Sequence, residues 1–431
     1  MSAPSGDHAA ALAALASELG ADAVREAGPG DLVDGVAPFA VVRPADAEQA
    51  RRAVAIAVRG GIALVASGLG RHLSIGAPPR HLGLLLRMDR VDRVVEHHAA
   101  DMTVTVEAGC TLAALDERLR RAGQWLPLDP PAPAETTVGG LVAANLAGPL
   151  RASQGGVRDL LLGIETVSGE GVVVRGGGRV VKNVAGYDLP RLHVGALGSL
   201  GVVLAATFKT VPVPPGEGAV EVEVASPREA CDLALALRDA FEPAWLELVA
   251  EAGGPATRVV FGCAGLPPEV ACGLLRARTE TEARGHRAVE VEDATALRAR
   301  LAEFPLREAA AILRVSTLPD RTGLALESLA RAARDCGVRA PLSAQVASGI
   351  ARAAIADAVA VAPVLRALRA RREDPDAAVV VERASAEVKP RLVGDADPWG
   401  DPGESLALVR GVKRALDPGG ILSPGRLPGG V

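Results

Sequence analysis

Apolar and polar positions in the first half of the chain switch repeatedly between the spacing of helices and that of strands. Helical spacing covers Ala9–Arg25 and Glu48–Arg59, and Asp46 can cap the second of these helices. Thr111 can cap a further helix that ends before Gly123. The predicted strands are Phe39–Arg43, Ile62–Ala66, Leu84–Leu86, Val91–Glu96, Thr103–Glu107, Val202–Lys209 and the hairpin of Leu160–Val167 with Gly171–Val174.

The second half of the chain has a slower rhythm, in which single strands alternate with longer helices. The predicted strands are Ala219–Val224, Trp245–Ala250, Thr257–Phe261 and Ala310–Val315. The predicted helices are Ser226–Ala240, Pro267–Arg284, Ala294–Ala302, Gly323–Asp335 and Glu404–Leu416. The Ala-rich stretch Ile350–Leu368 predicts an amphipathic helix, and its charged residues argue against a membrane span. We therefore expect an α+β half with an antiparallel sheet.

Chain length sets the expected number of domains. The sequence has 431 residues, more than one hydrophobic core usually covers, so two domains are the natural expectation. Val211–Pro215 contains three prolines and predicts a stiff linker between them. The predicted division is an N-terminal helix at 1–35, a first domain at 36–215, an α+β domain at 216–400 and a C-terminal helix and tail at 401–431.

Composition narrows the classes of function. The net charge is −5 and aromatic residues make up 2%, so we expect neither a basic stripe nor a stacking surface for nucleic acid. The five cysteines are dispersed, with no C-x-x-C pair and no zinc-like spacing, so we expect no metal or iron–sulfur cluster in this chain. The N-terminus lacks the basic start of a signal peptide, and no transmembrane segment is predicted.

A glycine-containing loop follows the predicted strand Ile62–Ala66. Gly68 and Gly70 let backbone N–H groups converge on an anion, which suits a pyrophosphate. The loop is not a Rossmann fingerprint, because Arg71-His72-Leu73 stands where the third glycine would be required. A plain surface turn is the alternative interpretation.

A second stretch of small residues, Glu135–Pro149, contains Gly139 and Gly140. Small residues let a helix start lie against a flat ligand, with its free N–H groups facing phosphate oxygens. Tight helix packing is the alternative, and it suits the alanines of this stretch. It suits Thr137 and Asn145 less well, because both carry hydrogen-bonding groups in an apolar setting.

Two further stretches complete the set of candidates. Gly155–Gly163 holds Arg158 and Asp159, which alone could be a surface ion pair. Gly178–Leu192 holds the single tyrosine of the chain, Tyr187, among Lys, Asn, Asp and Arg residues. A glycine-spaced run from 195 to 201 then leads into the strand that starts at Val202.

Together these stretches resemble the FAD-binding fold of the vanillyl-alcohol oxidase or PCMH type, and within it the E-subunit family of bacterial glycolate oxidase. The residues that carry the resemblance are Thr137–Ala143, Leu146–Pro149, Val157–Asp159 and above all the long run Val181–Leu189. The likeness is dense from about Ala40 to Pro214 and returns at Leu416–Pro418 and Pro424–Arg426.

The resemblance implies two small α/β subdomains that clasp FAD, a cap domain over the isoalloxazine, and a C-terminus that returns to the first domain. The expected cofactor-binding residues are Ser67, Gly68, Leu69, Gly70, Arg71, His72, Thr137, Gly139, Gly140, Ala144, Asn145, Arg158, Asp159, Gly163, Asn183, Gly186, Tyr187, Gly201 and Val202. Arg71, Arg158, Lys182 and Arg191 are candidates for stabilising phosphate or reduced-flavin charge. No catalytic base is assigned.

Two departures from the family pattern matter. Relatives of the substrate-oxidising subunit carry a histidine-rich patch in the cap, whereas His286 is the one histidine in the second half of this chain. In some oxidases of the same fold a histidine of the pyrophosphate loop is joined covalently to flavin. His72 leaves that option open beside the simpler one of a histidine next to phosphate.

The resemblance implies the FAD-binding subunit of a complex that oxidises glycolate, or a related 2-hydroxy acid such as D-lactate, to the 2-oxo acid. The expected partners are a second flavoprotein subunit and an iron–sulfur subunit that receives the electrons. We expect a cytoplasmic location, and docking through partners at the inner face of the plasma membrane is left open. Two alternatives stay open: a self-sufficient FAD-dependent dehydrogenase of D-lactate, another 2-hydroxy acid or a sugar lactone, and a structural subunit that lacks the cofactor.

Overall fold

The computed structural model describes residues 6–179, 186–254 and 256–431 and arranges them around three main β-sheets. The helices are α1 (Gly6–Leu19), α2 (Ala47–Arg59), α3 (Leu112–Arg120), α4 (Val138–Ala144), α5 (Arg151–Gln154), α6 (Val157–Leu160), α7 (Leu189–His193), α8 (Pro227–Phe241), α9 (Pro267–Ala283), α10 (Ala294–Ala302), α11 (Thr322–Asp335), α12 (Val361–Ala370) and α13 (Ser405–Leu416). Within these described residues, no helix has both the length and the apolar composition that crossing a bilayer requires.

The first sheet is small and mostly parallel. Its strands, in spatial order, are β1 (Val24–Glu26), β2 (Ala40–Val42), β4 (Leu84–Arg87) and β3 (Leu64–Ser67). Strand β4 lies parallel to both β2 and β3, while β1 is an antiparallel edge. Helix α2 is the crossover between β2 and β3, and Asp46 caps it by accepting a hydrogen bond from Gln49 N, as the sequence predicts.

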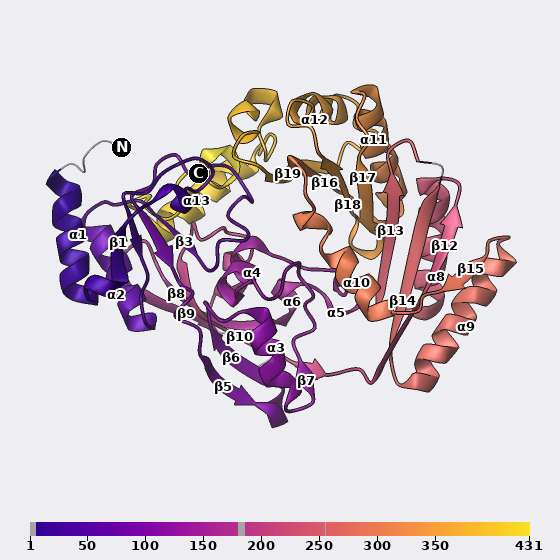
Figure 1. The fold of residues 1–431 in the computed structure, drawn as a ribbon, viewed down its shortest axis with the longest axis horizontal. Helices are drawn as coiled ribbons and strands as arrows, with labels where there is room; N and C mark the ends of the chain where they lie inside the picture. The colour runs from indigo at the N-terminus through magenta and orange to yellow at the C-terminus, as the bar shows by residue number, and fades with distance from the viewer. Residues whose placement is uncertain (1–5, 180–185, 255) are drawn as a thin grey trace.

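The second sheet is antiparallel and lies beside the first (Figure 1). Its strands, in spatial order, are β5 (Val94–His98), β6 (Thr103–Glu107), β10 (Val202–Lys209), β8 (Leu161–Val167) and β9 (Val173–Gly177). Strands β8 and β9 form the predicted hairpin, and β10 has the predicted bounds. The two sheets and their helices form the two small subdomains that the resemblance implies.

The third sheet has eight antiparallel strands and, with its helices, forms the layer that we call the cap (216–384). Its strands, in spatial order, are β15 (Ala288–Glu290), β12 (Gly216–Val224), β14 (Thr257–Gly265), β13 (Trp245–Glu251), β17 (Pro341–Gln345), β18 (Ile350–Ile355), β16 (Ala311–Ser316) and β19 (Ala378–Ala384). Apolar residues of α8, α9, α11 and α12 cover one face and form the largest core cluster. The opposite face turns toward the first two sheets (Figure 1).

Two predictions about individual elements were wrong. Ile350–Leu368 is not one helix: Ile350–Ile355 is strand β18, paired on both sides, because tertiary pairing outweighs the helix preference of alanine. The predicted helix Ala9–Arg25 ends at Leu19, and Val24 starts strand β1. The predicted stiff linker begins with β11 (Val211–Pro212), which pairs with β7 (Gln124–Trp125).

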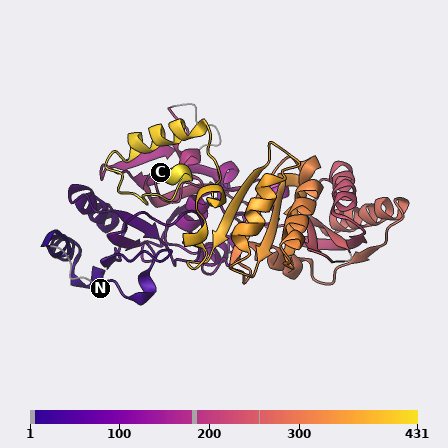
Figure 2. The same ribbon diagram turned by 90° about the horizontal axis from the view of Figure 1, so that it is seen from above.

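The C-terminal segment returns to the first sheet. Leu64 N donates to Ile421 O and Ser423 N donates to Leu64 O, so the tail extends the sheet beyond β3. Figure 2 shows this segment, in yellow, against the indigo and purple half of the chain. The α+β fold, the cap and the returning C-terminus are therefore as the sequence predicts.

Candidate functional site

The loop after β3 holds the first group of candidate residues. Strand β3 ends at Ser67, and the loop turns at Gly70, whose φ of +84° favours glycine. At Gly68 an added Cβ would lie 2.2 Å from Thr137 Oγ1. The loop backbone can therefore approach helix α4 only because residue 68 has no side chain.

Helix α4 faces this loop with its N-terminus. Thr137 caps it by accepting a hydrogen bond from Gly140 N at 3.2 Å. An added Cβ at Gly139 would lie 3.0 Å from Ala108 Cβ, so the helix start packs closely on the second sheet. The helix ends at Asn145, whose φ is +51°. The small residues thus serve close helix packing at Gly139, and they leave the first turn of the helix open at Gly140.

Three cavities join along this line. One of about 60 Å³ is lined by Ser67–Leu73 and by residues of α4, and a second of about 60 Å³ continues from Gly68 and Gly140 toward Gly198 and Gly201. A third, of about 340 Å³, opens beneath the cap and shares His72, Ala144 and Leu197 with the first. Together they form a groove that runs from the loop after β3 to the cap. We call this loop, Ser67–His72, the glycine loop, and the part of the groove beneath the cap the cap cavity.

His72 stands where the first cavity meets the cap cavity. Its Nε2 lies 2.7 Å from Thr136 Oγ1, and its Nδ1 is buried without a hydrogen-bond partner. Burial, together with the positive charges of Arg71 and Arg383, lowers the pKa of His72 to about 4. The ring is therefore neutral at neutral pH.

Arg426, from the returning C-terminus, lines the first cavity. Its Nη2 donates to the carbonyl oxygens of Leu73 at 2.7 Å and Ile75 at 2.5 Å, while its Nε and Nη1 are buried without hydrogen-bond partners. The nearest carboxylate, that of Asp34, lies 3.8 Å away and is itself bound by Lys389 at 2.6 Å. Arg426 can therefore donate to an anion in the groove. The sequence placed this segment near the first domain but gave Arg426 no role.

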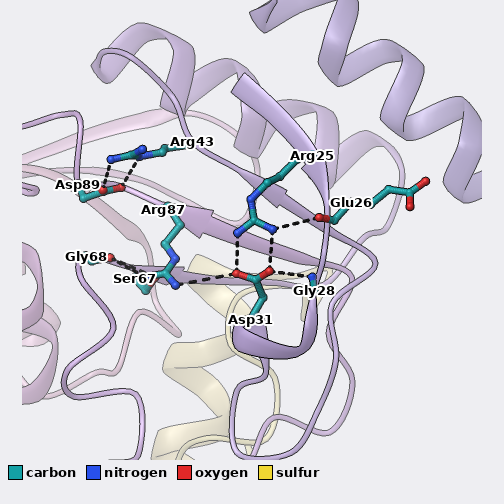
Figure 3. Close-up of polar contacts among 9 residues, drawn as sticks. All are labelled: Arg25, Glu26, Gly28, Asp31, Arg43, Ser67, Gly68, Arg87 and Asp89. Atoms are coloured by element: carbon teal, nitrogen blue, oxygen red, sulfur yellow. Dashed lines mark hydrogen bonds and ion pairs between the residues drawn. The ribbon is translucent and has the colours of Figure 1, made fainter. Parts of the chain in front are cut away.

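A polar cluster supports the glycine loop from behind (Figure 3). Arg25 binds Asp31 through two hydrogen bonds of 2.7 Å and lowers the pKa of that carboxyl to about 2. Arg87, at the end of β4, lies between Asp31 and the glycine loop. Its Nη2 is 4.0 Å from Asp31 Oδ1 and its Nη1 is 3.5 Å from Gly68 O. Arg87 thus places positive charge directly beside the loop.

The structure brings most of the predicted residues together and leaves others apart. The loop Ser67–His72 and Thr137, Gly139, Gly140, Ala144, Asn145 and Gly201 line the three cavities. Arg158, Asp159, Gly163, Gly186, Tyr187 and Val202 lie outside them. Asp159 instead accepts a hydrogen bond from Gly156 N, and the Tyr187 side chain is 92% exposed. Asn183 and Lys182 lie outside the described residues.

The cap contributes side chains that the sequence reasoning missed. Alternation along β16 and β18 buries Leu313 and Ala353 in the helix-covered core and turns Arg314 and Arg352 to the opposite face. Both arginines line the cap cavity with Glu382 of β19. The sequence signal that could have identified these arginines was a charged residue within a strand of otherwise apolar residues. For Arg352, the incorrect helix prediction hid it.

The comparison of the sequence with known families decides the nature of the groove. Residues 38–177 match the model of the family described as FAD binding domain. We call these matched residues the FAD binding domain. The FAD binding domain contains the glycine loop, helix α4 and the hairpin of β8 and β9.

Individual relatives match the same region. The chain is 41% identical to the glycolate oxidase subunit GlcE of Escherichia coli (strain K12) over 152 residues, 35% of this chain and 43% of that protein. It is 33% identical to the glycolate oxidase subunit GlcD of Bacillus subtilis (strain 168) over 177 residues, 41% of this chain and 38% of that protein. The chain thus spans less than half the length of these curated relatives.

The similarity in fold extends over the cap as well. The structure of p-cresol methylhydroxylase with substrate bound superposes with a TM-score of 0.78 at 19% identity, covering 98% of this chain and 97% of the other. At this identity the likeness establishes the fold and no more. It places the FAD binding domain and the cap in one shared architecture.

The groove fits the FAD that this domain family binds. Arg426 and His72 line the first cavity and carry buried nitrogen atoms without partners, which suits the oxygen atoms of a pyrophosphate. Gly68 and Gly140 keep side chains away from the same wall. The cap cavity adds room for a flat ring system lined by Ile75, Leu146 and Trp399.

Proposed function

We propose that this chain is the FAD-binding subunit of a complex that oxidises glycolate or a related 2-hydroxy acid to the 2-oxo acid. One observation carries the proposal: the glycine loop, the N-terminus of α4 and Arg426 meet around one groove that opens beneath the cap. The resemblance to glycolate oxidase subunits supports this substrate class. The proposal includes a second flavoprotein subunit and an iron–sulfur subunit as partners, in the cytoplasm.

Bound FAD supplies the acceptor for two electrons. Gly68 and Gly70 let the loop amides approach the phosphates, and Arg426 neutralises part of their charge. The cap face keeps bulk water from the reacting centre. We further propose that the predicted residues lining the three cavities bind the cofactor and that the chain divides into domains at Val211–Pro215.

The test begins with the purified full-length chain and a titration with FAD. We expect saturable uptake of one FAD per chain, and no uptake by correctly folded protein would refute the proposal. Glycolate and D-lactate are then added anaerobically while the visible flavin absorbance is followed. Slow or absent bleaching by the chain alone, with bleaching restored by co-purified partners, is the expected result.

A second candidate function is a self-sufficient FAD-dependent 2-hydroxy-acid dehydrogenase. The arginines of the cap cavity favour it, because they supply positive charge for a carboxylate within this chain. Rapid anaerobic bleaching of the isolated holoprotein by glycolate or D-lactate would support this candidate over the subunit. Co-purification from the native host decides the partners, since finding neither an iron–sulfur chain nor a second flavoprotein would contradict the complex.

A further inference from the structure

The cap cavity carries more positive charge than its own acids balance. Among the described residues that line it are four arginines, namely Arg151, Arg314, Arg352 and Arg383, and one carboxylate, that of Glu382. Burial alone would raise the pKa of Glu382, but Arg352 and Arg314 hold it below its ordinary value, so this carboxyl is ionised. After Glu382 balances one arginine, three positive charges are left in the cap cavity. They are separate from Arg71 and Arg426, which line the first cavity.

Two of the four arginines are already satisfied by the protein. Arg352 binds Glu382 through hydrogen bonds of 2.6 and 3.1 Å. Arg383 donates to the carbonyl oxygens of Pro305 at 3.0 Å and Arg307 at 2.5 Å. Each of these two guanidinium groups thus uses two of its five donors within the protein.

The other two arginines have free donors. Arg314 comes no closer than 3.8 Å to Glu382, and its Nε is buried without a partner. Arg151, the first residue of helix α5, also lines the cap cavity, and its side chain donates no hydrogen bond to any described residue. Burial and then repulsion from Arg314 lower the pKa of Arg151, so these like charges act on each other across the cavity.

The surroundings define the size and polarity of the ligand. The cavity of about 340 Å³ also has to hold the flavin ring, so it leaves room only for a small substrate. The neighbouring acid Glu247 does not compete for the arginines, because burial raises its pKa well above the ordinary value and keeps it neutral. A small carboxylate satisfies two facing guanidinium groups better than a neutral sugar or phenol does.

We propose that Arg314 of the cap and Arg151 of the FAD binding domain together bind the carboxylate of the substrate, so that this chain holds the substrate site. The inference rests on the proposed oxidation of a 2-hydroxy acid and deepens it by assigning the acid group to these two residues, and it favours the self-sufficient enzyme over the partner-dependent subunit. It also means that the missing histidine patch does not leave the cap without a means of binding substrate.

The test uses the FAD-loaded full-length chain and oxalate, which resembles glycolate but is not oxidised by removal of a hydride. Isothermal calorimetry gives the oxalate Kd, and the visible flavin spectrum reports whether binding occurs beside the ring. We expect saturable binding that weakens by about ten- to a hundredfold in Arg314→Met and in Arg151→Met, as for loss of a charge-assisted hydrogen bond. Arg314→Lys keeps the positive charge but loses the paired N–H donors of the guanidinium group. Its oxalate Kd should therefore lie between those of the wild type and Arg314→Met.

A matched control is Arg366→Ala, since Arg366 of α12 is 48% exposed and pairs with Asp395 outside the cavity. Its oxalate Kd should equal that of the wild type. Normal FAD uptake without oxalate binding would overturn the inference while leaving the proposed function standing. Failure to take up FAD would remove both. A shifted flavin midpoint potential in Arg314→Met with an unchanged oxalate Kd would also overturn it, because the arginine would then serve the reduced flavin.

Discussion

The buried ion pair between Lys413 and Asp417 fixes the C-terminal tail, and breaking it should be costly. Lys413 Nζ donates to Asp417 Oδ2 at 2.6 Å and to the carbonyl oxygens of Ser199 and Leu422. Asp417 also accepts hydrogen bonds from the backbone N–H groups of Ile421 and Leu422. Asp417→Ala therefore leaves a buried ammonium unpaired and two backbone donors unsatisfied.

The magnitude follows from burial. The side chains of Lys413 and Asp417 are 8% and 0% exposed, and removing one partner of such a pair costs about 3–5 kcal/mol of unfolding free energy. The chain offers a matched control in Arg121 and Glu117, which have the same i,i+4 spacing and a contact of 2.7 Å but are 65% and 73% exposed. Glu117→Ala should cost at most about 0.5 kcal/mol.

The assay is urea unfolding of both variants, followed by far-ultraviolet circular dichroism and by tryptophan fluorescence. Trp399 reports on the tail directly, because its indole Nε1 donates to Arg426 O at 3.0 Å. We expect a large fall in the urea midpoint for Asp417→Ala and weaker FAD retention, since Arg426 loses its fixed position. Equal losses in the two variants would refute the reasoning that burial decides the strength of this pair.

Three further predictions concern the groove and two buried histidines. Gly68→Ala should abolish FAD retention while the fold persists, because its Cβ would lie 2.2 Å from Thr137 Oγ1, whereas Gly411→Ala, with nothing within 4 Å, should retain FAD and be neutral or stabilising. Burial lowers the pKa of His193 to about 4, so the unfolded chain binds more protons between pH 4 and the ordinary value near 6.5. The free energy of unfolding should therefore be unaffected by His193 above that window and fall by about 3 kcal/mol as the pH is lowered through it. In His193→Gln the urea midpoint should depend less on pH over the same range. We expect acid precipitation to release FAD into the supernatant, whereas yellow colour in the washed pellet would indicate a covalent link through the unpartnered Nδ1 of His72.

Local patterns predicted the parts of the fold that local chemistry determines. Helix α2 starts at its Asp46 cap and strand β10 spans Val202–Lys209, because capping residues and alternation act over a few positions. The glycine loop and the α4 N-terminus were predicted for the same reason. Their steric need for glycine at position 68 is set by a contact with Thr137 far along the chain.

What the sequence did not reveal depends on contacts between distant segments. Ile350–Ile355 contains three alanines and reads as helix, yet pairing with β16 and β17 makes it a strand. That pairing is what places Arg352 beside Arg314. Arg426 reaches the groove only because the tail joins the first sheet, and no periodicity near Arg426 encodes that return.

The return of the tail also bears on the order of events during biosynthesis. Arg426 binds the carbonyl of Leu73, which lies 353 positions earlier in the chain. The ribosome therefore completes the glycine loop, the second sheet and the cap before the residue that closes the nucleotide end of the groove emerges. Cofactor capture should accordingly be a post-translational event, and a nascent chain stalled before Arg426 should display an open, loosely binding groove.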